Sequence, residues 1–167
     1  MKNLFSIIIL SFLLTSSVLG QNILREGGLR GGQTSGFTYR HYINEYLSYE
    51  SILSFRKSGM QVTLLRQLHE QESIIDIGYN FHFLYGMGGH AGFFFTDKYS
   101  SLGYENYYSQ KIFSPVIGID AYAAIEYHLN SYPLIFGIDY KPFFELSVYQ
   151  FFNMSIWDTS FTIKYRF

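Results

Sequence analysis

The chain contains no cysteine, and this absence excludes several classes of function. Without thiols it forms no disulfide framework, no thiolate metal site, no cysteine nucleophile and no lipid-modified cysteine of the lipoprotein type. Positive charge is also scarce, because 12 Lys and Arg residues stand against 13 Asp and Glu residues and form no basic block. Nucleic acid binding requires basic residues gathered on one face, so we expect no nucleic acid partner.

Proline and long apolar runs are rare as well. The 167 residues include 3 prolines but 20% aromatic residues, which indicates one ordered domain. After residue 20 no apolar run reaches the ~20 residues that a transmembrane helix needs. Before it, Lys2 precedes the mainly apolar run Leu4–Leu14, and Val18-Leu19-Gly20 ends on a small residue. This order predicts a signal peptide over residues 1–20 and an exported mature domain over residues 21–167.

The mature chain alternates with a period of two, which is typical of β-strands. From Ile117 to Tyr127 every second residue is apolar. The intervening residues include Asp120 and Glu126. A helix would not place these two sets on opposite faces, so the pattern predicts an all-β fold.

Turn signals divide the pattern into strands. Lys57-Ser58-Gly59 and Asn130–Pro133 each predict a hairpin, and Met87–Gly88 predicts a further tight connection. Longer connections are expected at 96–112 and 146–157, so that short and long connections alternate as in outer-membrane barrels. The glycine-rich segment 27–32 is expected to be a flexible entry to the first strand. The expected strands are 31–42, 47–56, 60–69, 75–86, 89–95, 113–128, 134–145 and 158–167, an even count of about eight that suits a closed barrel.

The face opposite the apolar one carries charges of both signs. A soluble barrel would expose them to water, whereas a membrane barrel would turn them into its lumen and present Phe, Tyr, Ile and Leu to lipid. The export signal and the 16 Tyr and 17 Phe residues favour the membrane. We therefore expect an eight-stranded antiparallel up-and-down transmembrane β-barrel in the bacterial outer membrane.

Several segments carry a resemblance to known proteins. The last strand alternates and ends on an aromatic residue, and it resembles the C-terminal signature that the outer-membrane assembly machinery recognises: Phe161, Ile163, Tyr165 and Phe167. With residues 36–41, 50–56, 85–90, 118–120 and 137–142, the chain resembles the small outer-membrane β-barrel proteins of the OmpX and OmpA-barrel type, and more narrowly an uncharacterised set of bacterial barrels. The resemblance implies an eight-stranded barrel and an outer-membrane location, and it brings no catalytic or binding residues.

The charged residues on the face opposite the apolar one form the candidate site. An eight-stranded barrel is just wide enough to be filled by side chains, so we expect no general pore. Unpaired charges in a narrow lumen are costly, so we expect these residues to pair as a structural network. The expected members are Arg40, Glu50, Arg56, Asp76, Asp120, Glu126, Asp139, Lys141, Lys164 and Arg166.

Catalytic and metal-binding patterns are weak. The 5 histidines are spread over separate strands without a close ligand pair, so we expect no metal and no cofactor. His128, Ser131 and Glu126 are the nearest hydrolase-like grouping, but a polar rim at the periplasmic end explains them more simply. Gly86-Met87-Gly88-Gly89 has no following helix or lysine, so it predicts a turn rather than a phosphate loop.

The expected function is a structural or surface-interaction role of the adhesin type, without enzymatic activity. Segments 96–112 and 146–157 would face a possible extracellular partner, and the tyrosines between residues 99 and 108 suit either such a surface or an interface girdle. Two alternatives stay open: an outer-membrane lipid-modifying barrel enzyme, and a soluble exported β-barrel that binds an apolar ligand inside.

Overall fold

The structure is a computed structural model that describes residues 24–56, 58–70, 80–101, 104–148 and 152–167. The predicted signal peptide, residues 1–20, lies outside the described residues. The described part is all β, and no helix in it is long and apolar enough to cross a membrane. Its strands are β1 (Arg25–Gly32), β2 (Ser35–Asn44), β3 (Leu47–Arg56), β4 (Gly59–His69), β5 (Phe81–Ser101), β6 (Tyr104–His128), β7 (Leu134–Tyr140), β8 (Phe143–Ser147), β9 (Asn153–Ser155) and β10 (Thr159–Arg166).

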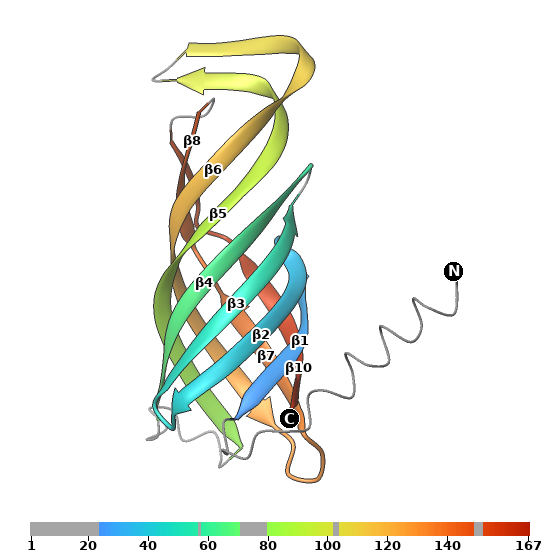
Figure 1. Ribbon diagram of the computed structural model, residues 1–167, viewed down its shortest axis with the longest axis vertical. Helices are drawn as coiled ribbons and strands as arrows, with labels where there is room; N and C mark the ends of the chain where they lie inside the picture. The colour runs from blue at the N-terminus through green and yellow to red at the C-terminus, as the bar shows by residue number, and fades with distance from the viewer. Residues whose placement is uncertain (1–23, 57, 71–79, 102–103, 149–151) are drawn as a thin grey trace, which may run out of the picture.

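The sheet closes into a barrel (Figure 1). Neighbouring strands from β1 to β6 pair antiparallel, and β1 also pairs with β10. Strand β7 lies between β6 and β10, whereas β8 lies between β6 and β9. Thus β7 and β8 are successive parts of one wall strand, and β9 and β10 are parts of another. The predicted eight-stranded antiparallel up-and-down barrel is confirmed.

The first wall strand begins earlier than predicted. Segment 27–32 is not a flexible entry, because it forms most of β1 and pairs with both β2 and β10. A Cβ at Gly28 would lie 2.2 Å from the carbonyl oxygen of Ile163, so glycine allows the close approach of β1 and β10. Glycines carry no hydrophobic signal, which hid the alternation of Glu26 and Arg30 with Leu29. The predicted strand 31–42 therefore spans the end of β1, a turn and most of β2.

A second error concerns the segment around Met87. The predicted turn at Met87–Gly88 is wrong, because β5 is one strand of 21 residues that runs through it. Gly86 pairs with Tyr122 and Gly88 with Asp120 in an unbroken ladder to β6. Residues 75–79 of the predicted strand 75–86 lie outside the described residues. One strand was missed and one was split, so the two errors cancelled in the count.

The predicted alternation of short and long connections is also wrong. Segment 96–112 is not a loop, because β5 continues to Ser101 and the 25-residue β6 begins at Tyr104. Segment 146–157 includes the end of β8 and all of β9, with residues 149–151 outside the described part. Figure 1 shows the long β5–β6 hairpin at one end of the barrel, opposite the C-terminus and the turn between β6 and β7. The two ends of the barrel thus differ because β5 and β6 are much longer than the other strands.

Two predicted hairpins are present. Arg56 pairs with Gly59, which places the hairpin between β3 and β4 where it was predicted, and Ser58 takes a left-handed φ of 68°. The turn at residues 129–133 joins β6 to β7. The predicted strand 134–145 is interrupted after Tyr140, because Pro142 has no N–H to donate to a ladder.

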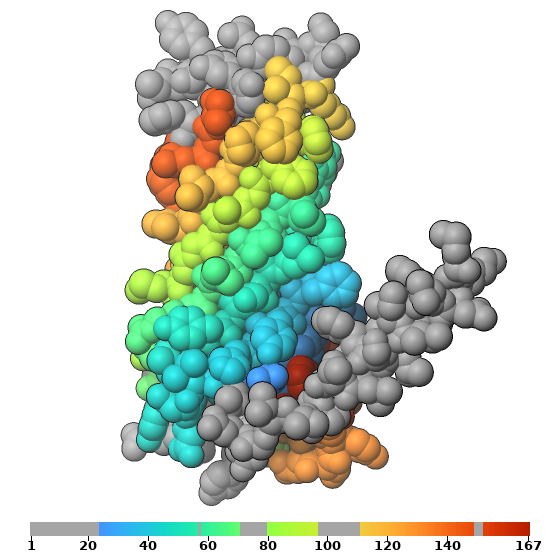
Figure 2. Space-filling view, in the orientation of Figure 1, coloured from blue at the N-terminus to red at the C-terminus, as the bar shows by residue number. Residues whose placement is uncertain are grey.

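The two faces of the wall differ in chemistry. Along β10 the side chains from Ser160 to Lys164 are alternately buried and exposed, and the buried ones are polar. The same alternation holds in β3 and β4. Figure 2 shows that side chains of β2 to β5 form a continuous surface on one face of the barrel. The interior is therefore mainly polar and the outer surface mainly apolar.

Candidate functional site

Six charged side chains meet in the half of the lumen nearer to the C-terminus. We call them the Arg40 cluster, and they are Glu26, Arg40, Glu50, Glu126, Lys164 and Arg166. Arg40 on β2 is fully buried at the centre. Its guanidinium nitrogens lie 2.7 Å from oxygens of Glu50 and Glu126 and 2.9 Å from an oxygen of Glu26. One arginine therefore links carboxylates from three different strands.

The other two cations complete this cluster. The ammonium group of Lys164 lies 3.0 Å from Glu50 and 2.9 Å from Glu126. The guanidinium of Arg166 lies 3.0 Å from Glu26. Each of the three carboxylates thus contacts two of the three cations. Such mutual pairing offsets part of the cost of removing charges from water.

Neutral groups satisfy further lone pairs of the same carboxylates. The Thr38 hydroxyl donates a hydrogen bond to Glu50, and the side-chain amide of Gln67 donates another at 2.6 Å. The Tyr42 hydroxyl donates to Glu26 at 3.0 Å. These bonds hold the carboxylates in fixed positions, as a buried polar network requires.

A second group of charges occupies the half of the lumen nearer to the β5–β6 hairpin. We call it the Lys141 cluster, and it contains Arg30, Arg56, His90, Asp120, Asp139, Lys141, Glu145 and Asp158. Lys141 is fully buried, with its ammonium group 3.0 Å from Asp120 and 3.3 Å from Asp158. Arg30 lies 2.6 Å from Asp139 and 3.5 Å from Asp158. The pairs form one continuous chain of charges.

His90 joins Asp120 to Glu145 within this chain. Its Nδ1 lies 2.8 Å from Asp120 and its Nε2 lies 3.4 Å from Glu145. The ring lies over Gly118 on β6, where a Cβ would approach within 2.4 Å of the imidazole carbon Cε1. A glycine at position 118 is therefore required for the imidazole to reach both carboxylates.

Arg56 is the last charged residue of this chain and pairs with Glu145. Its guanidinium donates two hydrogen bonds to Glu145, at 2.5 and 3.1 Å. The guanidinium carbon lies 5.6 Å from the ring centre of Phe94 and 5.2 Å from that of Phe143. Both distances suit cation–π contacts. Arg56 is thus held between one carboxylate and two aromatic rings.

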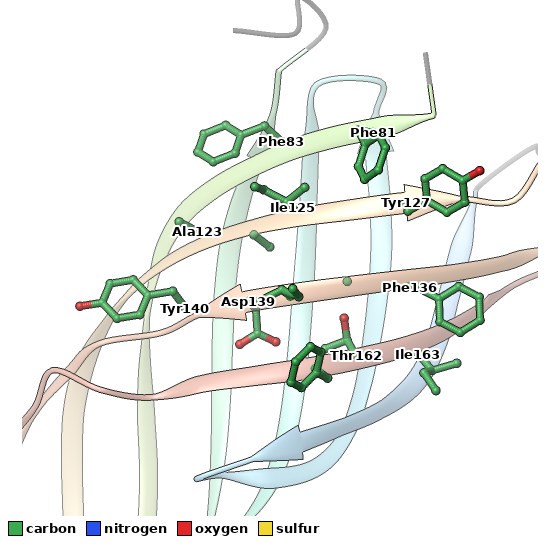
Figure 3. A pocket seen from close by; sticks show the side chains of 14 residues that line it. Phe81, Phe83, Ala123, Ile125, Tyr127, Phe136, Asp139, Tyr140, Thr162 and Ile163 are labelled. Carbon is green, nitrogen blue, oxygen red and sulfur yellow. The ribbon is translucent and has the colours of Figure 1, made fainter. Parts of the chain in front are cut away.

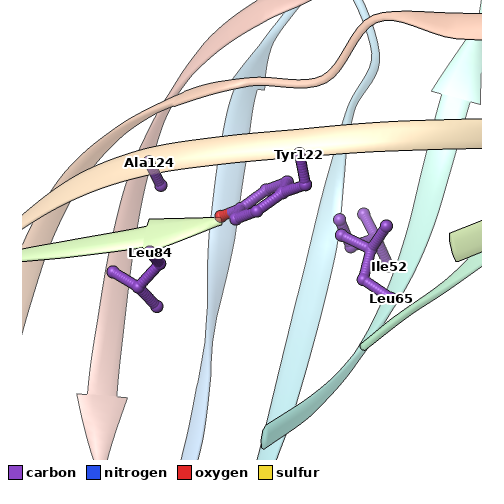
Figure 4. Close-up of a cluster of buried hydrophobic side chains, with 5 residues drawn as sticks. All are labelled: Ile52, Leu65, Leu84, Tyr122 and Ala124. Atoms are coloured by element: carbon purple, nitrogen blue, oxygen red, sulfur yellow. The ribbon is translucent and has the colours of Figure 1, made fainter. Parts of the chain in front are cut away.

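Apolar side chains separate the two clusters on β3 and β6. Ile52 lies between Glu50 and Arg56 along β3, and Tyr122 lies between Asp120 and Glu126 along β6. Figure 4 shows the buried apolar group that they form with neighbours from β4 and β5. Its members are Ile52, Leu65, Leu84, Tyr122 and Ala124.

The outer surface forms a broad apolar belt. Leu64 is 62% exposed, Ile119 67% and Phe161 68%, although all three lie in the middle of strands. Soluble proteins rarely expose contiguous apolar surface on this scale. The side chains of the predicted assembly signal also point outward and are exposed: Phe161, Ile163, Tyr165 and Phe167.

Most of the predicted network residues take part in these two clusters. Asp76 lies outside the described residues. Sequence reasoning did not include Glu26, Arg30, His90 and Asp158 in the network. It expected Glu145 on the charged face but assigned it no partner, and in the structure Glu145 pairs with Arg56. Glu26 and Arg30 were hidden by the glycines of β1. His90 and Asp158 lie on predicted strands, so alternation alone could have found both.

The hydrolase-like grouping takes a different form. His128 receives a hydrogen bond from Arg166 at its Nδ1 (3.0 Å) and stacks on His82 with 4.0 Å between ring centres. Its Nε2 lies 3.7 Å from Glu126, and Ser131 is exposed in the turn. No group of three or more metal-ligating side chains occurs among the described residues.

No family model and no curated protein sequence matches the chain. The resemblance to the OmpX and OmpA-barrel type therefore stays a prediction.

Proposed function

We propose that this protein is a small outer-membrane β-barrel with a filled lumen and a structural or surface-interaction role. The observation that carries the proposal is the inverted distribution of side chains. Charged residues such as Arg40, Lys141 and Lys164 are fully buried inside, whereas large apolar residues cover the outside. This is the arrangement that a bilayer favours, because lipid solvates the apolar wall and the lumen shields the charges.

The proposed orientation follows from the two ends of the barrel. The C-terminus lies at one end, which we assign to the periplasm, and the β5–β6 hairpin lies at the other (Figure 1). The β4–β5 ladder ends at Phe94, whereas the β5–β6 ladder continues to Ser101 and Tyr104. We propose that this projecting hairpin, with the connection after β8, is the surface offered to an extracellular partner.

The membrane location is tested by solubility and gel mobility. We expect the protein to require detergent in solution and to migrate differently on gels with and without heating, as closed barrels do. A monodisperse protein that stays in aqueous buffer without detergent would contradict the membrane proposal and favour the soluble alternative.

The filled lumen is tested by conductance in planar bilayers. The chain of side chains from Asp139 to Arg56 crosses the half of the lumen nearer to the hairpin. We therefore expect no steady channel of porin size. Such channels would overturn the filled-lumen proposal while leaving the membrane location intact.

The two alternatives gain no support from the described residues. A lumen filled with ion pairs does not suit an apolar ligand. The Ser131 hydroxyl lies in an exposed turn, and His128 is engaged by Arg166, which does not suit a catalytic triad.

A further inference from the structure

A groove crosses the outer surface of the wall formed by β5, β6, β7 and β10 (Figure 3). It has a volume of about 660 Å³, which lies within the range of small-molecule sites. It begins beside Phe81 and Tyr127, close to the β6–β7 turn, and continues to Tyr140. It therefore lies on the half of the wall nearer to the C-terminus.

Strand register explains the shape of the groove. Three rows of outward residues cross the four strands, and the middle row runs from Phe83 through Ile125 and Ile138 to Phe161. In the row nearer to the hairpin, β6 contributes only Ala123. The small side chain leaves space between larger neighbours, so the surface is hollowed there.

The chemistry of the lining is almost purely hydrocarbon at the surface. Phe81 and Tyr127 are in ring contact, with 4.9 Å between centres, at one end of the groove. Tyr140 lies at the other end, and the hydroxyls of the two tyrosines point away from the floor (Figure 3). Between these hydroxyls the exposed floor is formed by Ile125 and Ile138. A flexible apolar chain fits such a surface, whereas a polar ligand would lose its hydrogen bonds.

We propose that this groove holds one acyl chain of a phospholipid from the membrane leaflet nearer to the C-terminus. The inference rests on the proposed membrane location, because the groove is continuous with the apolar belt that would face lipid. The groove offers an acyl chain contacts on both sides, from Phe81 and Tyr127 at one end to Tyr140 at the other. The bound lipid would be retained rather than exchanged freely.

A second copy of the chain fits the groove less well. A two-fold interface places the same patch against itself, so a concave centre on one copy would face a concave centre on the other. The resulting void would lack packing contacts. A hydrocarbon chain adapts its shape to the groove without this cost.

Fluorescence quenching tests the proposal. The only tryptophan, Trp157, is replaced in a Trp157→Phe background, and Tyr140→Trp then reports on the end of the groove without adding bulk to its floor. Tyr49→Trp on β3 is the matched control, because Tyr49 is also outward and exposed but lies on a strand that does not line the groove. The barrels are folded in vesicles of chain-brominated phosphatidylcholine and then extracted into lipid-free detergent. We expect quenching at both positions in the vesicles. After extraction the quenching should persist at position 140 and disappear at position 49, because detergent replaces the lipid on the general surface but not the chain held in the groove.

Two substitutions separate the groove from the general lipid surface. Ala123→Leu fills the groove, whereas Ala91→Leu adds the same group at another outward alanine, on β5 between Val62 and Ile117. Mass spectrometry of the intact barrel released from detergent should show one retained phospholipid. We expect Ala123→Leu to lose it and Ala91→Leu to keep it.

The possible outcomes separate the failures. Loss of quenching at both positions on extraction would overturn the groove proposal and leave the membrane location standing. No quenching at either position in the vesicles would overturn the membrane location itself. Weaker quenching at position 140 than at position 49 in the vesicles, together with cross-linked dimers, would replace the lipid by a second copy.

Discussion

The Arg40 and Lys141 clusters share one lumen but differ in how completely their charges are satisfied. In the Arg40 cluster three cations face three carboxylates, and each carboxylate contacts two cations. In the Lys141 cluster four carboxylates face three permanent cations and His90. The first is a closed network, and the second is an open chain.

Buried atoms without a hydrogen bond follow the same division. Among the described residues, one such atom belongs to the half of the lumen with the Arg40 cluster, in His128. The others lie in the half with the Lys141 cluster, in Ser54, His90, Ser114, Asp158 and Ser160. Unsatisfied buried groups reduce stability. The comparison teaches that the half of the lumen nearer to the C-terminus stabilises the barrel more than the half below the hairpin.

The largest expected effect is that of Arg40→Met. The change leaves Glu26, Glu50 and Glu126 with two cations instead of three in a buried site. We expect a loss of about 3–5 kcal/mol in the free energy of unfolding, measured by urea titration in lipid vesicles. Arg40→Lys keeps the charge but not the forked geometry, so it should lose less. If Arg40→Met lowered the free energy of unfolding by no more than the loss of a surface charge does, the difference between the two clusters would be contradicted.

A second pair of substitutions compares the clusters directly. Glu126→Gln removes a carboxylate that accepts hydrogen bonds from Arg40 at 2.7 and 2.8 Å and from Lys164 at 2.9 Å. We expect it to cost about 3 kcal/mol. Asp158→Asn removes a carboxylate with longer ion-pair distances, 3.3 Å to Lys141 and 3.5 Å to Arg30, from the cluster that has more carboxylates. It keeps an oxygen that can accept the hydrogen bond from the Thr34 hydroxyl, so it should cost only about 1–2 kcal/mol. Equal losses in the same urea titration would remove the distinction.

The smallest expected effects come from two serines of β3, both fully buried. The Ser48 hydroxyl lies 2.7 Å from Nε2 of His69, so Ser48→Ala should cost about 1–2 kcal/mol. The Ser54 hydroxyl has no hydrogen-bond partner among the described residues, so Ser54→Ala should be neutral or slightly stabilising. Thermal unfolding of the two variants, measured side by side, shows which substitution lowers the stability more. A larger loss for Ser54→Ala would contradict it.

Sequence reasoning succeeded where side chains carry a clear alternation. The hairpin between β3 and β4 and the strand β10 were predicted with small boundary errors, because apolar and polar residues alternate at most positions there. It failed at β1 and at the middle of β5, where glycine replaces the informative side chains. In both places the ladder of the neighbouring strands, not local propensity, holds the segment as a strand.

The candidate site shows the same limit. Alternation placed Arg40, Glu50 and Glu126 on one face, so a common lumen could be expected. It could not show that Arg40 lies between carboxylates of three strands, since that depends on the register of each ladder and on closure of the barrel. The groove beside Ala123 likewise depends on which residues of β5, β7 and β10 stand in register with β6.

By itself the sequence determined the all-β class and the two chemically different faces, because these follow from the period-two pattern along each strand. Only the tertiary structure decided which charges meet, where the two clusters separate and how far β5 and β6 project. The physical reason is that ion pairs and grooves form between strands far apart in the chain, and their partners are set by barrel closure and register.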